Sequence, residues 1–258
     1  MARKIVITSG KGGVGKTSIV ANLGLSLASM GKRVVLCDMD FGLNNLDIVL
    51  GLENKIMYDM ADAVDGRCRP KQALVQCDVQ KNLYILASGH GFKKSVTSQN
   101  VKAVINSFDK TFDYILIDCP AGIDTGFHRA VSSADEAIVV VTPHISSLRD
   151  ADKVIGMLKS YRIENLFLVV NIVRGDLVVD GSTLSPEQIE SVLKVCMIGV
   201  IPDDDKVLLC VGGAVGKSGK AFKMLANNIE KGTNKIYRFR KGYEGFWGSI
   251  KRGLRRSL

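Results

Sequence analysis

At residues 10–17 the sequence reads GKGGVGKT, which matches the pattern G-x-x-x-x-G-K-[S/T] at every fixed position. An apolar run, KIVI at 4–7, precedes this stretch, and a segment with helical spacing of apolar residues follows it at 17–30. In this strand–loop–helix context the pattern forms a phosphate-binding loop. Glycines lack a Cβ atom, so successive backbone N–H groups can converge on phosphate oxygens, and the helix N-terminus adds its dipole. The stretch therefore predicts a P-loop that binds the phosphates of ATP.

Short apolar runs rich in β-branched residues recur along the chain, as expected for strands buried on both faces of a parallel sheet. They lie at 4–7, 33–37, 83–87, 114–118, 137–142, 166–171 and 197–201. Helix-like segments lie between several of them, at 17–30, 99–108, 146–160 and 185–194. This alternation predicts an α/β fold with a doubly wound, mostly parallel sheet. We expect residues 1–232 to form this P-loop domain and residues 233–258 to form a linker and a tail.

Polar residues in the loop and at one strand end are candidates for nucleotide and metal chemistry. Lys16 is expected to reach the β- and γ-phosphates of ATP, and Thr17 is expected to ligate Mg²⁺. The predicted strand at 33–37 is followed by Asp38 and Asp40, at the end of a strand where α/β folds bind ligands. We expect Asp40 to organise the attacking water beside the metal, and Asp38 to support the metal or the loop. A capping role for either carboxylate is the alternative.

A second strand end carries another candidate carboxylate. Asp118 follows four apolar residues, the pattern of a Walker B acid that holds Mg²⁺ directly or through water. Pro120 and Gly122 come next and predict a switch segment that senses the γ-phosphate. Cys119 has no Cys or His close to it in the sequence, so we interpret it as a small structural thiol. The predicted cofactors are ATP or ADP and Mg²⁺.

The bulk composition narrows the class of protein. The chain has 258 residues, of which 46% are hydrophobic and 24% are charged, which fits one soluble domain. Its six cysteines form no CxxC pair, which argues against a zinc or redox motif. The first apolar run is too short for a signal peptide, and no stretch approaches the ~20 apolar residues of a spanning helix. We therefore expect a protein of the cytoplasm or the membrane periphery.

The net charge of +9 is concentrated at the C-terminal end. Residues 235–258 hold eight of the 35 basic residues and one of the 26 acidic residues, which leaves a net charge of +2 for residues 1–234. Proteins that bind DNA through its phosphates present basic residues on the folded domain. The nearly neutral folded part therefore argues against a specific nucleic-acid partner, and the positive charge belongs to the tail.

The tail has the residue pattern of an amphipathic helix. At 100° per residue, aromatic and apolar side chains fall on one arc and basic side chains on the opposite arc. The first arc holds Tyr243, Phe246, Trp247, Ile250 and Leu254, and the basic residues are Lys251, Arg252, Arg255 and Arg256. This pattern is typical of a helix that lies in the interface of an anionic membrane. A final helix that docks on the core with a solvated basic face is the alternative.

A second lysine, Lys11, stands near the start of the loop, where an ordinary P-loop needs none. With it the loop resembles that of the deviant Walker A ATPases of the MinD/ParA family. This resemblance implies a homodimer that encloses ATP, with Lys11 contacting the nucleotide of the partner subunit. It also implies that Asn171 hydrogen-bonds the adenine, which Pro202 and Asp203 cover. The resemblance implies that Lys11, Lys16 and Asp40 are catalytic and that Thr17, Asp40 and Asp118 bind the metal. The residues that it implies for nucleotide binding are Gly10, Lys11, Gly12, Gly13, Val14, Gly15, Lys16, Thr17, Ser18, Asn171, Pro202 and Asp203.

Within this family, the segments at 40–51, 118–123 and 146–152 are similar to those of the septum site-determining MinD type. The resemblance implies an ATPase that positions the division site, hydrolyses ATP slowly unless stimulated, and binds the inner face of the plasma membrane with ATP. It also implies a MinC-like division inhibitor and a MinE-like or other activator as partners. The chain departs from the type at Asn44, which replaces Arg, and at Ile172, which interrupts the run N-R-x-R. A flagellar-placement ATPase of the FlhG type and a DNA-segregation ATPase of the ParA type are the alternatives.

Overall fold

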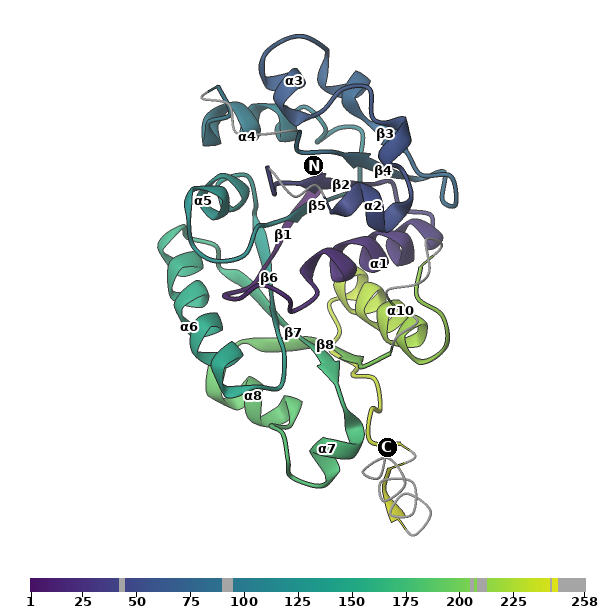
Figure 1. The fold of residues 1–258 in the computed structure, drawn as a ribbon, viewed down its shortest axis with the longest axis vertical. Helices are drawn as coiled ribbons and strands as arrows, with labels where there is room; N and C mark the ends of the chain where they lie inside the picture. Colours follow the sequence, from purple (N-terminus) through teal and green to yellow (C-terminus); the bar gives the residue numbers. More distant parts are fainter. Residues whose placement is uncertain (42–44, 90–94, 205–206, 208–212, 242, 246–258) are drawn as a thin grey trace.

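The computed structural model of this chain describes residues 1–41, 45–89, 95–204, 207, 213–241 and 243–245. The described residues contain an eight-stranded sheet that runs through the middle of the molecule (Figure 1). Its strands are β1 (Arg3–Thr8), β2 (Val34–Asp38), β3 (Val75–Gln76), β4 (Leu83–Leu86), β5 (Tyr114–Asp118), β6 (Glu136–Val141), β7 (Asn165–Val173) and β8 (Cys196–Pro202).

The strand order places β1 at the centre of the sheet. The order is β3-β4-β2-β5-β1-β6-β7-β8, and every pair is parallel except β3 with β4. Asp118 of β5 aligns with Ile7 of β1 on one side and with Asp38 of β2 on the other. From β1 the chain turns first to strands on one side and later, from β6 onward, to strands on the other. The loop after β1 therefore leaves the sheet where the strand order reverses, the usual position of a ligand site in this architecture.

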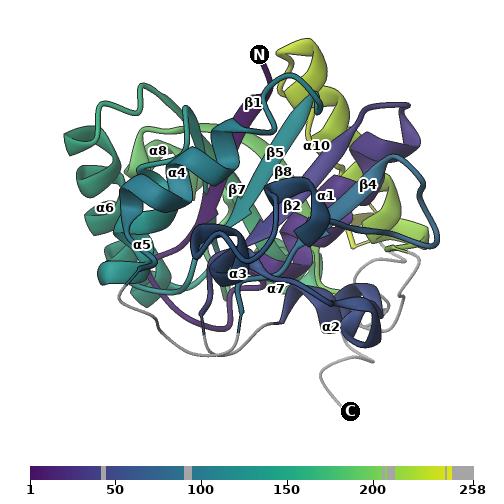
Figure 2. The ribbon, with the colours of Figure 1, turned by 90° about the horizontal axis from the view of Figure 1, so that it is seen from above.

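Helices cover both faces of the sheet (Figure 2). One face is covered by α1 (Lys16–Ser29) and α10 (Gly216–Lys231), and the other by α4 (Ser98–Asn106), α5 (Thr125–Val131), α6 (Ile145–Ser160) and α8 (Pro186–Leu193). Shorter elements are α2 (Leu46–Leu50), α3 (Met60–Val64), α7 (Gly175–Val179) and the 3-10 turns η1 (Glu53–Lys55) and η2 (Pro70–Ala73). This arrangement confirms the predicted doubly wound α/β fold.

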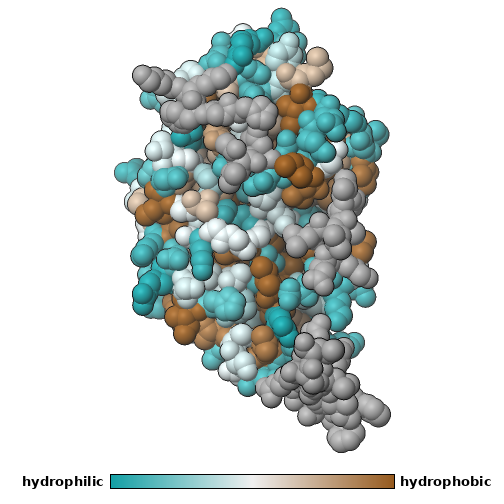
Figure 3. All heavy atoms as spheres, viewed as in Figure 1, coloured by the Kyte–Doolittle hydropathy of each residue, from teal (hydrophilic) through white to brown (hydrophobic). Residues whose placement is uncertain are grey.

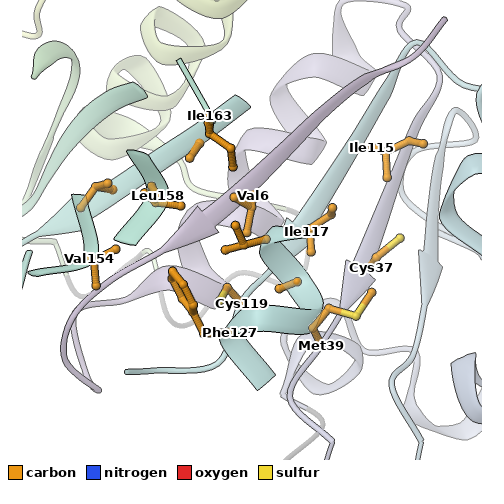
Figure 4. Close-up of a cluster of buried hydrophobic side chains, with 14 of the residues drawn as sticks. Val6, Cys37, Met39, Ile115, Ile117, Cys119, Phe127, Val154, Leu158 and Ile163 are labelled. Atoms are coloured by element: carbon orange, nitrogen blue, oxygen red, sulfur yellow. The ribbon is translucent and has the colours of Figure 1, made fainter. Parts of the chain in front are cut away.

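The core consists of two apolar clusters, one on each face of the sheet. Successive side chains of a strand point to opposite faces, so the apolar strand runs supply both clusters at once. In β1, for example, Ile5 and Ile7 belong to the cluster under α1 and α10, whereas Val6 belongs to the cluster under α5 and α6. Figure 4 shows part of the second cluster, in which Val6 and Ile117 lie close to Phe127 of α5.

Most large apolar side chains are enclosed in these two clusters. On the face seen in Figure 3, hydrophobic residues form small separate patches among hydrophilic ones. The most exposed apolar side chains include Met57 and Ile145. Within the described part of the chain, no helix combines the length and the apolarity that crossing a membrane would require.

The strands and helices predicted for residues 1–232 all have counterparts in the structure, with ends within two residues of the expected ones. The sequence analysis missed the two-residue edge strand β3, the short helices α2, α3, α5 and α7, and the 16-residue helix α10. Gly216 and Gly219 in the first turn of α10 conceal its helical pattern, because glycine is a poor helix former. The later spacing of its buried residues Phe222, Leu225 and Ile229 is helical.

The chain folds back onto the domain after α10. This helix ends at Lys231 and is capped by Gly232, whose φ of 62° suits a glycine. The side-chain amide of Asn228 then donates to the carbonyl oxygen of Lys235 at 2.8 Å. Farther on, Tyr243 is only 8% exposed, and a Cβ atom placed on Gly175 of α7 would lie 2.9 Å from its ring. We expected Tyr243 on a membrane-binding arc, but the structure buries it against α7. The rest of the predicted tail helix, residues 246–258, lies outside the described residues.

Candidate functional site

The phosphate loop joins β1 to α1 at the carboxyl edge of the sheet. Gly13 and Gly15 have φ angles of 77° and 85°, in the left-handed region that glycine adopts without a steric penalty. Gly15 is the N-cap of α1, which begins at Lys16. The first N–H groups of a helix have no partner within the helix, so they and the helix dipole favour an anion at this end. The loop is therefore shaped to hold phosphate groups.

The Lys16 side chain folds inward along this loop and is largely buried. Its Nζ atom donates to the Oγ atom of Ser9 at 3.0 Å, and that hydroxyl donates to the carbonyl oxygen of Lys11 at 2.7 Å. Burial lowers the pKa of Lys16, while the nearby carboxylates of Asp118 and Asp40 act in the opposite direction. A buried ammonium gains most from an anionic partner, and a phosphate group in the loop would supply one.

Three carboxylates lie at the ends of the neighbouring strands β2 and β5, and two of them, Asp118 and Asp40, act on the pKa of Lys16. Burial raises the pKa of Asp118 to about 7 and that of Asp38 to about 6, and it also raises the pKa of Asp40. Asp38 accepts hydrogen bonds from the backbone N–H groups of Asp40 at 2.8 Å and of Leu46 at 3.3 Å. Asp38 therefore fixes the backbone of the segment between β2 and α2, and its expected support of the metal or the phosphate loop stays a prediction.

Asp118 and Thr17 have the chemistry of a Mg²⁺ site. The Oδ1 atom of Asp118 is buried and has no hydrogen-bond partner among the described residues, whereas the Thr17 hydroxyl hydrogen-bonds the same carboxylate. Carboxylate and hydroxyl oxygens are ligands that Mg²⁺ prefers, and a bound cation would stabilise the ionised form of the buried acid. The residues present therefore fit a Mg²⁺ ion held between the loop and β5, with Asp40 close by.

The adenine side of the predicted site also reaches the loop. The Nδ2 atom of Asn171 in β7 donates to the carbonyl oxygen of Val14 at 2.8 Å. A Cβ atom placed on Gly15 would lie 2.5 Å from that same Nδ2 atom, so the loop glycine allows the close approach. The next residue, Ile172, has a φ of 57°, within an irregularity of the pairing between β7 and β8. The regular pairing of β7 is thus interrupted directly after Asn171, the residue whose side chain contacts the phosphate loop.

Pro202 and Asp203 extend the site along β8. Pro202 pairs with Val173, and the N–H group of Asp203 donates to the carbonyl oxygen of Val173 at 3.0 Å. Both residues line a pocket together with Arg174, whose guanidinium pairs with Asp176 at 2.7 Å. The same pocket is lined from the C-terminal segment by Tyr237, Phe239, Lys241 and Tyr243. Asn171 is not among the residues that line this pocket, so the structure places the predicted base-binding residues on neighbouring strand ends but not in one pocket.

Lys11 differs from Lys16 in its surroundings. Its side chain is exposed, as are Gly12 and Gly13, whereas Lys16 is directed inward. An exposed lysine at the outer side of the loop is free of the metal site and available to a second molecule. The trans role implied for Lys11 stays a prediction, because the structure contains one chain.

The sequence analysis missed two residues of the site. Ser9, which is fully buried, receives the hydrogen bond of Lys16. Asp124 caps α5 through hydrogen bonds from the N–H groups of Gly126 and Phe127, and its charge helps to raise the pKa of Asp40. The position of Ser9 directly before the loop could have indicated a role. The spacing of Asp124 from Asp118 gives no comparable signal, since a turn of unknown shape separates them.

Cys119 lies in the core beside the site. It is buried with Phe127 and Ile117, as Figure 4 shows. Burial raises the pKa of its thiol to about 12. A thiol that stays protonated is a poor nucleophile and a poor metal ligand, so the placement agrees with a structural role.

A glycine loop between a central strand and a helix, an inward lysine, and acids on the adjacent strand ends together define a P-loop nucleotide-binding protein. A family model described as an AAA domain matches residues 2–167. The septum site-determining protein MinD of Bacillus subtilis is 49% identical over 211 residues, which cover 81% of this chain and 79% of the relative.

Solved structures agree with this relationship. A chain of the MinC:MinD cell division protein complex of Aquifex aeolicus has a TM-score of 0.85 and 39% identity, covering 92% of this chain and 99% of that one. MinD of Pyrococcus horikoshii, complexed with Mg-ADP, has a TM-score of 0.78 and 32% identity, covering 90% of this chain and 97% of that one. The chain belongs to the MinD family of septum site-determining proteins.

Proposed function

We propose that this chain is a Mg²⁺-dependent ATPase that helps to position the division site, cycling between a cytoplasmic form and an ATP-bound form on the inner face of the plasma membrane. The observation that carries the proposal is the inward Lys16, surrounded by the glycine loop and Asp118. The MinD relatives described above support the placement role, and the Mg-ADP complex of the Pyrococcus protein supports the cofactor.

The residues of the site divide the work of binding and hydrolysis between them. The loop amides and Lys16 hold the β- and γ-phosphates, and Thr17 and Asp118 hold Mg²⁺, which neutralises charge on the phosphates. Asp40 lines a pocket of about 200 Å³ between the segments that follow β2 and β5, where it can orient an attacking water. Asn171 and the segment that starts at Pro202 hold the adenine.

Loss of Lys16 tests the nucleotide site. In Lys16→Ala the backbone amides alone would leave the phosphate charge poorly compensated, so the affinity for ATP should fall by at least about 100-fold. Equilibrium binding of a fluorescent ATP analogue measures this, with Lys71→Ala as the control at an exposed lysine outside the site. Unchanged affinity in Lys16→Ala would refute the assignment of the P-loop.

We further propose that ATP joins two subunits, with Lys11 reaching the nucleotide of the partner. Its exposure at the outer side of the loop supports this role. Lys11→Ala should bind ATP with nearly normal affinity but stay monomeric. Sedimentation with ATP and with ADP distinguishes the two cases, and an ATP-dependent dimer of Lys11→Ala would rule out the trans contact.

The tail should attach this dimer to an anionic membrane through Phe246, Trp247, Ile250, Leu254 and the basic residues Lys251, Arg252, Arg255 and Arg256. One tail should bind weakly, and a dimer with two tails far more strongly, through effective concentration. Because Phe239 and Tyr243 pack on the domain, the truncation that tests this proposal should keep them and end at Gly245.

Co-sedimentation with anionic vesicles, in ATP and in ADP, is the measurement. The full chain should pellet mainly with ATP, whereas the chain ending at Gly245 and the double variant Phe246→Asp/Ile250→Asp should stay in solution. Vesicles of neutral lipid are the control for the basic residues. Pelleting of the truncated chain would show that the anchor lies elsewhere, and displacement of the vesicles by DNA at equal affinity would favour the ParA-type alternative.

The remaining partners follow from the family. The Aquifex relative was solved in a complex of MinC with MinD, which supports a MinC-like division inhibitor as a partner of this chain. A MinE-like or other activator would speed a hydrolysis step that is otherwise slow. Stimulation of the ATPase rate by candidate activators on vesicles would test that expectation, and a rate that is fast without any partner would contradict it.

A further inference from the structure

A buried arginine contacts the segment that carries Asp40. Arg129 of α5 is only 6% exposed, and its guanidinium carbon lies 5.4 Å from the centre of the Phe41 ring. Phe41 is the residue directly after Asp40. A guanidinium over an aromatic face is attracted by the negative charge of the ring face, most strongly when both groups are shielded from water. The pKa of Arg129 is lowered by burial, and the charge of Asp124 opposes that effect.

Arg129 and Phe41 line the same pocket as Asp40, the carboxylate proposed to orient the attacking water. Together with Asp124, these three residues line a pocket of about 200 Å³. Asp124 caps the helix on which Arg129 lies and contributes to the raised pKa of Asp40. One wall of the pocket therefore comes from the segment after β2 and the other from the segment after β5 and from α5.

Hydrogen bonds also hold the backbone of Asp40. Its N–H group donates to the carboxylate of Asp38 at 2.8 Å, which orients the backbone on the N-terminal side of Asp40. On the other side, the Ser88 hydroxyl donates to the carbonyl oxygen of Asp40 at 3.0 Å. Phe41 lies one residue beyond Asp40, and its contact with Arg129 adds a third restraint, on the residue that follows the carboxylate. A displacement of about 1 Å at a reacting group can reduce a rate by about 100-fold.

We propose that Arg129 is a positioning residue for ATP hydrolysis, which acts through the face of the Phe41 ring to aim Asp40. This inference rests on the proposed function, in which Asp40 orients the attacking water. Neither Arg129 nor Phe41 belongs to the loop that binds phosphate. Their loss should therefore reduce kcat while KM and the affinity for ATP change little.

A double-mutant cycle on the full chain tests this proposal. Arg129→Met keeps an unbranched apolar side chain but removes the charged guanidinium. Phe41→Leu keeps an apolar side chain but removes the aromatic ring face. Each should lower kcat by about 10- to 100-fold with KM within about twofold, and the double variant should be no slower than the worse single variant. Phe41→Tyr retains the ring face and should keep most of the wild-type rate.

Two control measurements, binding of a fluorescent ATP analogue and thermal unfolding, are made for every variant. If Arg129→Met does not fold, the contrast between Phe41→Leu and Phe41→Tyr still tests the role of the ring face. Multiplying effects in the double variant, an unchanged kcat in Phe41→Leu, or a loss confined to KM would overturn the positioning role. A wild-type chain that binds ATP without hydrolysing it would instead overturn the proposed function.

Discussion

Gly10, the first glycine of the phosphate loop, lies directly against the backbone of Asp150 in α6. A Cβ atom placed on Gly10 would be 2.3 Å from both the carbonyl carbon and the carbonyl oxygen of Asp150. Backbone atoms inside a helix cannot move aside as a flexible side chain can. The start of the phosphate loop is thus packed tightly against α6.

Replacing Gly10 should therefore be costly, and replacing its neighbour Gly12 should not. Gly10→Ala should lower the free energy of unfolding by at least about 2 kcal/mol, because the added methyl group overlaps the backbone of Asp150. A Cβ atom on Gly12 would meet only the Ala121 side chain, at 3.9 Å, so Gly12→Ala should stay within about 1 kcal/mol. Urea unfolding of the nucleotide-free protein measures both changes. Equal effects of the two substitutions would contradict the packing described here.

Asp40 should matter for hydrolysis more than for binding. Asp40→Ala should bind ATP and form the ATP-dependent dimer, but it should hydrolyse ATP about 100-fold more slowly, since water positioning counts in the transition state. Hydrolysis rate and light scattering of the same sample provide the two readings. Asp78→Ala, at an exposed carboxylate paired with Lys55, is the control. Normal hydrolysis by Asp40→Ala would leave this residue a structural role only.

The raised pKa of Asp118 should make the nucleotide-free protein less stable as the pH rises. A carboxyl group whose pKa is about 7 in the folded state and 3.8 in the unfolded state binds its proton more tightly when folded. Its contribution to stability is present below about pH 4 and is lost as the pH rises to about 7. Asp118→Asn should thus be more stable than the wild type at pH 8, by at most about 4 kcal/mol.

Urea unfolding at pH 5, 6, 7 and 8 measures this difference, which should shrink steadily toward pH 5. Adding Mg²⁺ and ADP at pH 8 should stabilise the wild type but stabilise Asp118→Asn much less, because the amide is a poorer metal ligand. A stability difference that is the same at every pH would mean that Asp118 is ionised at low pH despite its burial.

The sequence could predict the parts of the site that follow from motif and strand position. The glycine loop and the acids Asp38 and Asp118 come at the ends of apolar runs, and parallel pairing brings those ends to one edge of the sheet. Contacts between segments far apart in the chain left no such pattern. The approach of Arg129 to Phe41 depends on how α5 packs, and no local spacing encodes it.

The C-terminal segment shows a different limit of the sequence. Its helical periodicity placed Tyr243 on the same arc as Phe246, as if one helix included both. In the structure Tyr243 instead packs on Gly175, where a residue without a side chain leaves room for its ring. Periodicity describes how residues are arranged within an element, and it does not indicate where the element begins.

The position of the septum in dividing cells tests the central claim most directly. The chromosomal gene is replaced by one that encodes Lys16→Ala, and the position of each septum is measured along the long axis of the cell. The account predicts a narrow distribution for the wild type and widely scattered septa for Lys16→Ala, since a chain that cannot bind ATP cannot complete its cycle. An unchanged distribution, with the variant present at the wild-type level, would contradict the proposal that this ATPase positions the division site.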